Sequence, residues 1–239
     1  MKRILMCLAV ALVAFFPTAR AEPKKTAKEG LQELHELIGS WKCTGNPLVG
    51  SKEERDKFWQ EKISWQWQFK EKDVWLLADL TKGKHYTRFT IRYLPDKDEY
   101  KLEATTADKK TLTFAGKLDK KKLTFERTDE KTKQSERLVF QLLHNNRYVL
   151  YFEERPADSK SFTQQYRIGS TKEGAPFASV DNGPECIVSG GKGTIAVSYK
   201  GKTYYVCCSG CRDAFKDEPE KYIKEYEEAQ KKKKEKKEE

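Results

Sequence analysis

Long apolar runs are scarce in this chain of 239 residues, and their scarcity limits what kind of protein it can be. The one continuous apolar run covers residues 4–16, and nothing later approaches the roughly 20 apolar residues that a membrane-spanning helix needs. Hydrophobic residues make up 37% of the chain and charged residues 35%, which excludes a membrane bundle and a collagen-like or prion-like polymer. We therefore expect one or two small water-soluble domains without a transmembrane segment.

The single apolar run has the organisation of an export signal. Lys2 and Arg3 precede it, and Ala19-Arg20-Ala21 follows it as an A-x-A cleavage site. A membrane anchor is the alternative, but the run is too short to span a bilayer. We expect residues 1–21 to be a signal peptide and the mature protein to be exported, to the periplasm or to the outside of the cell.

A strong excess of one charge is also missing from the rest of the chain. The 47 Lys and Arg face 37 Asp and Glu, a formal charge of +10, and residues 1–21 contribute three bases and no acid, which leaves 44 − 37 = +7. The remaining bases are mostly interleaved with acids, which is typical of a solvated surface rather than of a track for a polyanion. Nucleic acid is therefore not an expected partner, and the sequence indicates no particular protein partner.

Histidine is rare, and recognisable catalytic motifs are missing. The chain has His35, His85 and His144, and it has no Gly-x-Ser-x-Gly, Walker or His-Glu-x-x-His sequence. A lone histidine is more often structural than catalytic, so none of the three receives a role. The sequence predicts a binding protein rather than an enzyme.

The mature chain begins with features of a short helix at residues 22–40. Thr26 and Glu29 form a capping box, leucines recur at helical spacing, and Gly39 is expected to end the helix. Residues 41–168 then change to period two, as where Trp65 and Trp67 alternate with glutamines. About nine or ten such runs, separated by turn residues and not by helices, predict an antiparallel up-and-down barrel or strongly curled sheet. The expected fold is mainly β, and α+β overall.

The sequence Gly39-Ser40-Trp41, directly after the short helix, resembles the Gly-x-Trp start of lipocalin-like (calycin) barrels. This resemblance covers residues 31–168, and it implies that Trp41 plugs one end of a barrel that encloses a small apolar ligand. The alternative is that the inward aromatic side chains fill the core, as they do in small barrels.

A second module follows a linker at residues 169–183, which is rich in Gly, Pro, Ser and Asn. Residues 184–224 read as a turn, a β-hairpin over residues 194–206, and one or two helices. Residues 225–239 form a charged tail, which either extends the last helix or is frayed or disordered; a basic patch for an anionic surface is a further alternative.

Four of the five cysteines after residue 21 lie in the second module, and three of them have the spacing of metal ligands. If a helix begins near Cys207, the sulfurs of Cys207 and Cys211 share one face, and the hairpin returns the chain so that Cys186 can meet them. Cys208 should point away from this face. Thiolates bind soft or borderline ions, so we expect Cu(I) or Zn(II).

These cysteines and the surrounding aromatic residues also resemble the YHS domain and the overlapping TRASH pattern of metal-binding modules. Residues 199–211 are similar to the Tyr-x-Gly-x-x-Tyr-Tyr-x-Cys-Cys core, and Phe215, Pro219 and Tyr222 follow as the family's anchors. The resemblance covers about residues 184–224. The chain departs from the family at Ile187, where Pro is common, and at Ser189-Gly190, which replaces Gly-Met.

Two alternatives to a metal site remain open. An oxidising compartment favours disulfides, although five cysteines cannot all pair within one chain. Thiol redox chemistry is less favoured, because adjacent cysteines are not a Cys-x-x-Cys motif.

No histidine follows His144, so the module lacks a histidine for a fourth ligand. Three thiolates suit trigonal Cu(I), or Zn(II) completed by water, by Asp213 or by a residue of the first domain. Such an open site fits metal sensing, storage or delivery.

Overall fold

The structure is a computed structural model that describes residues 24–144, 146–174 and 183–238, with side chains described as far as residue 235. The expected signal peptide, residues 1–21, lies outside the described residues. No helix among the described residues is long and apolar enough to cross a membrane.

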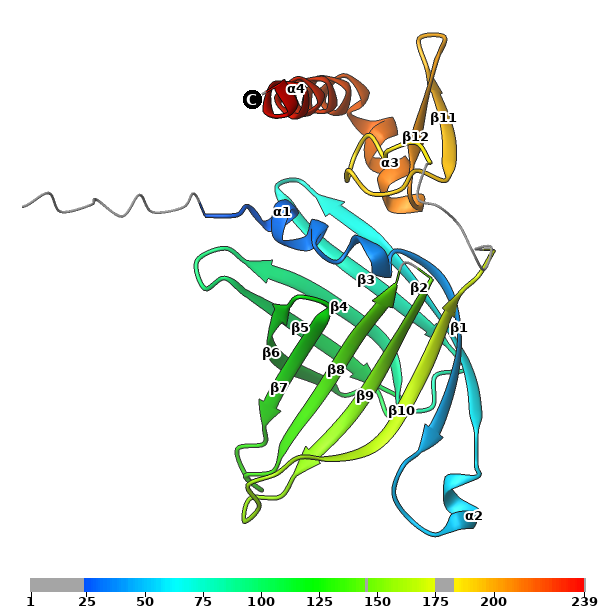
Figure 1. The fold of residues 1–239 in the computed structure, drawn as a ribbon, viewed down its shortest axis with the longest axis vertical. Coiled ribbons are helices and arrows are strands. Elements are labelled where there is room, and N and C mark those ends of the chain that lie inside the picture. The colour runs from blue at the N-terminus through cyan, green and yellow to red at the C-terminus, as the bar shows by residue number, and fades with distance from the viewer. Residues whose placement is uncertain (1–23, 145, 175–182, 239) are drawn as a thin grey trace, which may run out of the picture.

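A closed antiparallel barrel of ten strands forms the first part of the chain, which confirms the predicted fold class (Figure 1). Each strand pairs with its neighbours in sequence, and β1 closes the barrel by pairing with both β2 and β10. The strands are β1 (Gly39–Pro47), β2 (Trp59–Lys70), β3 (Asp73–Thr81), β4 (Tyr86–Leu94), β5 (Glu99–Thr106), β6 (Thr111–Asp119), β7 (Lys122–Thr128), β8 (Ser135–His144), β9 (Arg147–Arg155) and β10 (Thr163–Lys172).

The barrel is slightly longer than the predicted range of residues 41–168. Its pairing continues from Ile168 through the buried Ser170 to Lys172, which lies opposite Trp41. The alternation of apolar residues ends at Ile168, so the hydrophobic pattern alone does not reveal that strand pairing continues to Lys172. A helix not expected from the sequence, α2 (Lys52–Arg55), lies in the connection between β1 and β2.

The short N-terminal helix is present as α1 (Ala27–Gln32) followed by the 3-10 turn η1 (His35–Leu37), and Thr26 forms the predicted capping box with Glu29. Gly39 is not a helix stop but the first residue of β1, with a φ of +122°. Trp41 is 1% exposed, and its indole Nε1 donates to the carbonyl of Leu37 at 2.7 Å. Trp41 is thus buried against the turn that follows α1, and its role as a plug of the barrel stays a prediction.

Aromatic rings meet across the interior of the barrel. Trp65 of β2, Phe89 of β4 and Phe140 of β8 lie with their ring centroids 6.1 Å from one another, although their strands belong to different sides of the barrel. Trp65 and Trp67 both point inward and are almost fully buried, as predicted. At this level side chains fill the interior, which favours a packed core over an enclosed ligand.

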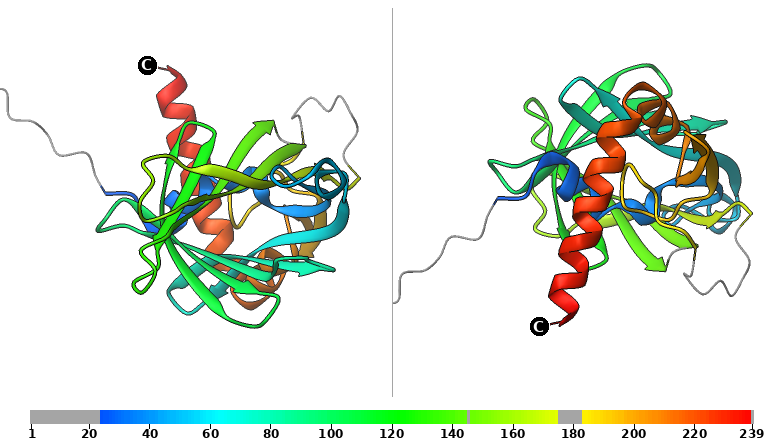
Figure 2. Two further views of the ribbon diagram at one scale, coloured as in Figure 1. Left: turned by 90° about the horizontal axis from the view of Figure 1, so that it is seen from below. Right: turned by 90° about the horizontal axis from the view of Figure 1, so that it is seen from above.

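The cysteine module contains the predicted hairpin and two helices. Its elements are β11 (Ile195–Tyr199), β12 (Lys202–Val206), α3 (Ser209–Asp217) and α4 (Pro219–Glu238). Lys200 and Gly201 both have positive φ, as a two-residue hairpin turn requires. The tail is not frayed: α4 continues through it to Glu238, and Figure 2 shows this helix crossing over one end of the barrel.

The module is docked on an edge that the barrel leaves open. Gly39 at the start of β1 pairs with Trp65, so the end of β2 has no β1 partner. The start of α3 covers this edge: the Trp67 backbone N–H donates to Cys208 Sγ at 3.4 Å, and Ser209 Oγ donates to Gln66 Oε1 at 2.6 Å. Covering an unpaired strand edge in this way satisfies backbone groups and blocks edge-to-edge association.

Candidate metal centre

Three elements of the module bring three cysteines together. Cys186 lies in the loop before β11, Cys207 directly follows β12, and Cys211 lies in the first turn of α3. Their sulfur atoms all lie within 4.8 Å of one another, and the sulfurs of Cys207 and Cys211 are 3.5 Å apart. The hairpin supplies the return of the chain, because the backbone N–H of Ile187 donates to the carbonyl of Tyr205 on β12.

The three sulfurs meet as predicted, but the helix begins later than expected. The helix begins at Ser209, so Cys207 lies outside it and the two cysteines do not share a helix face. Cys208 is the N-cap, with an extended backbone at φ −159° and ψ 174°, and the chain turns into the helix directly after it. The sulfurs of Cys207 and Cys211 therefore meet across the N-terminus of α3.

Ser189 fixes the loop that carries Cys186. Its backbone N–H points to Cys186 Sγ at 3.5 Å, its hydroxyl lies 3.3 Å from Cys207 Sγ, and the residue is 1% exposed. Gln32 of α1 in turn donates to the Ser189 carbonyl at 2.8 Å. A helix that belongs to the barrel domain thus holds the loop of Cys186, and neither Ser189 nor Gln32 was predicted from the sequence as a site residue.

Cys208 is buried and adjacent to the cluster without belonging to it. Its sulfur accepts the Trp67 backbone N–H and lies 3.9 Å from Cys207 Sγ, but it is not one of the three atoms that lie mutually within 4.8 Å. Cys208 therefore contacts the barrel as well as the neighbouring thiol. Cys43 lies inside the barrel and hydrogen-bonds with Ser170 at 3.2 Å.

The thiols of the cluster shift one another's pKa. The five described cysteines are all free thiols. The neighbouring thiols of Cys207 and Cys211 donate to Cys186 and lower its pKa, whereas burial is the main cause that raises the pKa of Cys211. Negative charge is thus stabilised on one sulfur, while three thiolates at this spacing would repel one another unless a cation lay between them.

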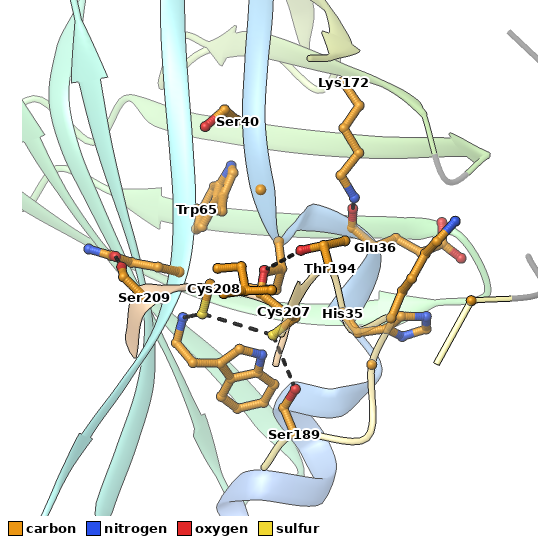
Figure 3. A pocket seen from close by; sticks show the side chains of 18 of the residues that line it. His35, Glu36, Ser40, Trp65, Lys172, Ser189, Thr194, Cys207, Cys208 and Ser209 are labelled. Atoms are coloured by element: carbon orange, nitrogen blue, oxygen red, sulfur yellow. Dashed lines mark hydrogen bonds between the residues drawn. The ribbon is translucent and has the colours of Figure 1, made fainter. Parts of the chain in front are cut away.

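The three cysteines differ in their exposure. Cys186 and Cys211 are 0% exposed, while Cys207 is partly exposed. Cys207 lines a cavity of about 790 Å³ between the module and the barrel (Figure 3). Asp213, the carboxylate considered as a further ligand, is exposed and pairs with Arg212 instead. Among the described residues, no fourth side chain of a metal-binding type joins the three sulfurs.

Comparison with known families agrees with this reading of the module. The model of the YHS domain matches residues 192–226, which include Cys207 and Cys211 but not Cys186. A search of curated proteins found no match to the chain. The chain therefore combines a ten-stranded antiparallel barrel with a C-terminal module that is similar to the YHS domain.

Proposed function

We propose that this protein is an exported, non-enzymatic binding protein that holds one soft or borderline metal ion, Cu(I) or Zn(II), through Cys186, Cys207 and Cys211. The observation that carries the proposal is the mutual approach of the three sulfurs within 4.8 Å. A zinc–sulfur bond of about 2.3 Å places tetrahedral thiolates about 3.8 Å apart. The donor set is also soft, as these ions prefer.

The exposure of the site toward the cavity supports an exchangeable metal ion rather than a permanently bound structural one. Closed structural zinc sites have four protein ligands, whereas this cluster offers three and faces a cavity through Cys207. An ion held in this way can be gained and lost without unfolding the module. This property suits metal sensing, storage or delivery.

Two other functions are less well supported. A carrier of a small apolar ligand needs space inside the barrel, but the rings of Trp65, Phe89 and Phe140 meet across it. A disulfide between Cys207 and Cys211 would use the same 3.5 Å approach, and it is the main competitor in an oxidising compartment.

The test is a metal titration of the full reduced chain with Cu(I) and Zn(II), followed by thiolate-to-metal absorption. We expect one equivalent to bind, and each of Cys186→Ser, Cys207→Ser and Cys211→Ser to weaken binding at least about 100-fold, because each removes a ligand. Cys43→Ser, inside the barrel, is the matched control and should leave affinity unchanged. Equal loss in Cys208→Ser, or full affinity in Cys186→Ser, would overturn the ligand set.

Isolation of the protein from its native host without reductant tests the compartment and the oxidation state together. We expect it outside the cytoplasm, beginning near Glu22, with metal bound and the cluster thiols unbridged. A cytoplasmic protein contradicts export, and a metal-free protein with bridged cysteines supports the disulfide alternative.

A further inference from the structure

The cavity beside Cys207 has the size of a small-molecule site. Its volume of about 790 Å³ lies within the range of roughly 300–1,000 Å³ that is typical of ligand pockets. The barrel contributes Ser40 and Lys172 to its wall, and the module contributes Ser189, Thr194 and Cys207 (Figure 3). A water molecule alone is far too small to fill this space.

The wall of the cavity carries charged side chains of both signs. The wall includes the acids Glu36, Glu173 and Glu185, and the bases Lys172 and Lys192. The acids also pair with bases that are not part of the wall: Glu36 with Lys121, Glu173 with Lys62, and Glu185 with Lys233. A zwitterionic molecule would therefore meet partners of both signs among the described residues of the wall.

Two residues of this wall each have a buried polar atom without a hydrogen-bond partner. Three side-chain nitrogen or oxygen atoms among the described residues are buried and unpaired, and two of them, Trp67 Nε1 and Glu36 Oε2, belong to residues that line this cavity. Trp67 is 0% exposed. Unpaired buried polar groups are costly and few in folded proteins. The Glu36 side chain is 11% exposed, so an ammonium group in the cavity could give its carboxylate a further partner.

The same wall carries the one thiol of the cluster that is partly exposed. If the proposed function holds, a molecule in the cavity can reach the metal beside Cys207, where the described residues supply no fourth ligand. We propose that this cavity binds a small zwitterionic chelator, the size of one to three amino acids, which completes the coordination of the metal. Its ammonium group faces Glu36, and its anionic end faces the lysines of the wall, Lys172 and Lys192.

The experiment uses L-histidine as the zwitterionic probe and imidazole as a probe with the same donor ring but no ammonium or carboxylate group. The full zinc-loaded chain is titrated with each probe by calorimetry, and native mass spectrometry counts protein, zinc and probe in the complex. We expect a ternary complex in which L-histidine binds at least about 10-fold more tightly than imidazole, since only L-histidine carries the charged groups.

Ser40→Phe fills the cavity, and Thr44→Phe places the same ring further along the exposed face of β1, outside the cavity. We expect Ser40→Phe to reduce L-histidine affinity at least about 10-fold and Thr44→Phe to leave it within about twofold, while zinc affinity without L-histidine stays equal in both. Glu36→Gln should bring the affinity for L-histidine close to that for imidazole.

The outcomes separate this inference from the proposed function. If the wild-type chain binds no zinc, the proposed function and this inference are both wrong. If zinc binds but L-histidine forms no ternary complex or only removes the metal, the inference alone is wrong. It is also wrong if Ser40→Phe and Thr44→Phe bind L-histidine equally well.

Discussion

Gly210 lies so close to Trp67 that a Cβ at position 210 would be 1.7 Å from the Trp67 carbonyl oxygen. The first turn of α3 therefore meets strand β2 backbone to backbone. The contact is next to the hydrogen bond from the Trp67 N–H to Cys208 Sγ. Glycine at this position lets the cysteine module dock on the open edge of the barrel, one residue before Cys211, a proposed ligand.

We expect Gly210→Ala to loosen this docking. Because the added methyl group meets a backbone carbonyl that cannot rotate away, the free energy of unfolding should fall by about 1–3 kcal/mol in urea denaturation. Hydrogen exchange should rise at the start of α3 and in the last residues of β2. Gly169→Ala is the matched control, since its Cβ would lie 3.9 Å from the nearest atom, the Thr44 carbonyl oxygen. Equal effects of the two substitutions would show that the close approach does not hold the module.

Ser189→Ala should weaken metal binding without unfolding the protein. Its hydroxyl lies 3.3 Å from Cys207 Sγ, and loss of a partner that orients a ligand typically costs 10–100-fold in metal affinity. We expect about a 10-fold loss in competition with a chelator and a shift of the thiolate-to-metal absorption band. The free energy of unfolding of the metal-free protein should change little. Ser198→Ala, on the exposed face of β11, is the control and should change neither quantity. A normal affinity and an unshifted band in Ser189→Ala would contradict a positioning role.

Local patterns in the sequence predict the barrel and the approach of the three cysteines. Alternation such as that of Trp65 and Trp67 with glutamines specifies which face of a strand is buried, and a hairpin specifies that the chain returns. The contacts between the domains carry no such periodicity. Gln32 reaches the Ser189 carbonyl across 157 residues, and Trp67 meets Cys208 across 141, so neither partner is visible in a local window.

The tail shows how a distant contact overrides a local expectation. Its composition of lysine and glutamate is typical of a frayed or disordered end. In the structure Gln230 and Lys233 hydrogen-bond to the carboxylate of Glu185, at 2.8 and 2.7 Å, next to Cys186. These contacts attach the predicted tail to the ligand loop, and α4 continues to Glu238.

Phe140→Ala should open a cavity where the barrel is now filled. Phe140 is 0% exposed and contacts the rings of Trp65, Phe89 and Phe125, so its truncation should lower the free energy of unfolding by about 3–5 kcal/mol. The variant should bind benzene, with quenching of tryptophan fluorescence, whereas the wild type should not. Leu143→Ala, exposed on the same strand, should change stability by less than about 0.5 kcal/mol. Binding of benzene by the wild-type barrel would restore the carrier hypothesis.

His85 should make the stability of the barrel depend on pH. Its ring stacks on Tyr166 with a centroid distance of 4.2 Å, and burial, assisted by the nearby Lys84, lowers the pKa of His85 from 6.5 to about 4. Between these two values the unfolded chain binds a proton that the folded protein does not, so stability is complete above about pH 6.5 and falls as the pH drops toward 4.

The matching variant is His85→Phe, which keeps a ring on Tyr166 and cannot titrate. We expect the difference in unfolding free energy between wild type and variant to be constant from pH 7 to 8. Below pH 6.5 the wild type should lose about 1–2 kcal/mol of unfolding free energy relative to His85→Phe. This value is reduced for the partial exposure of the imidazole. Urea denaturation of the reduced, metal-free proteins from pH 8 to 4.5 measures this difference. If the two curves stay parallel over the whole range, the imidazole is not held neutral by its surroundings in the folded barrel.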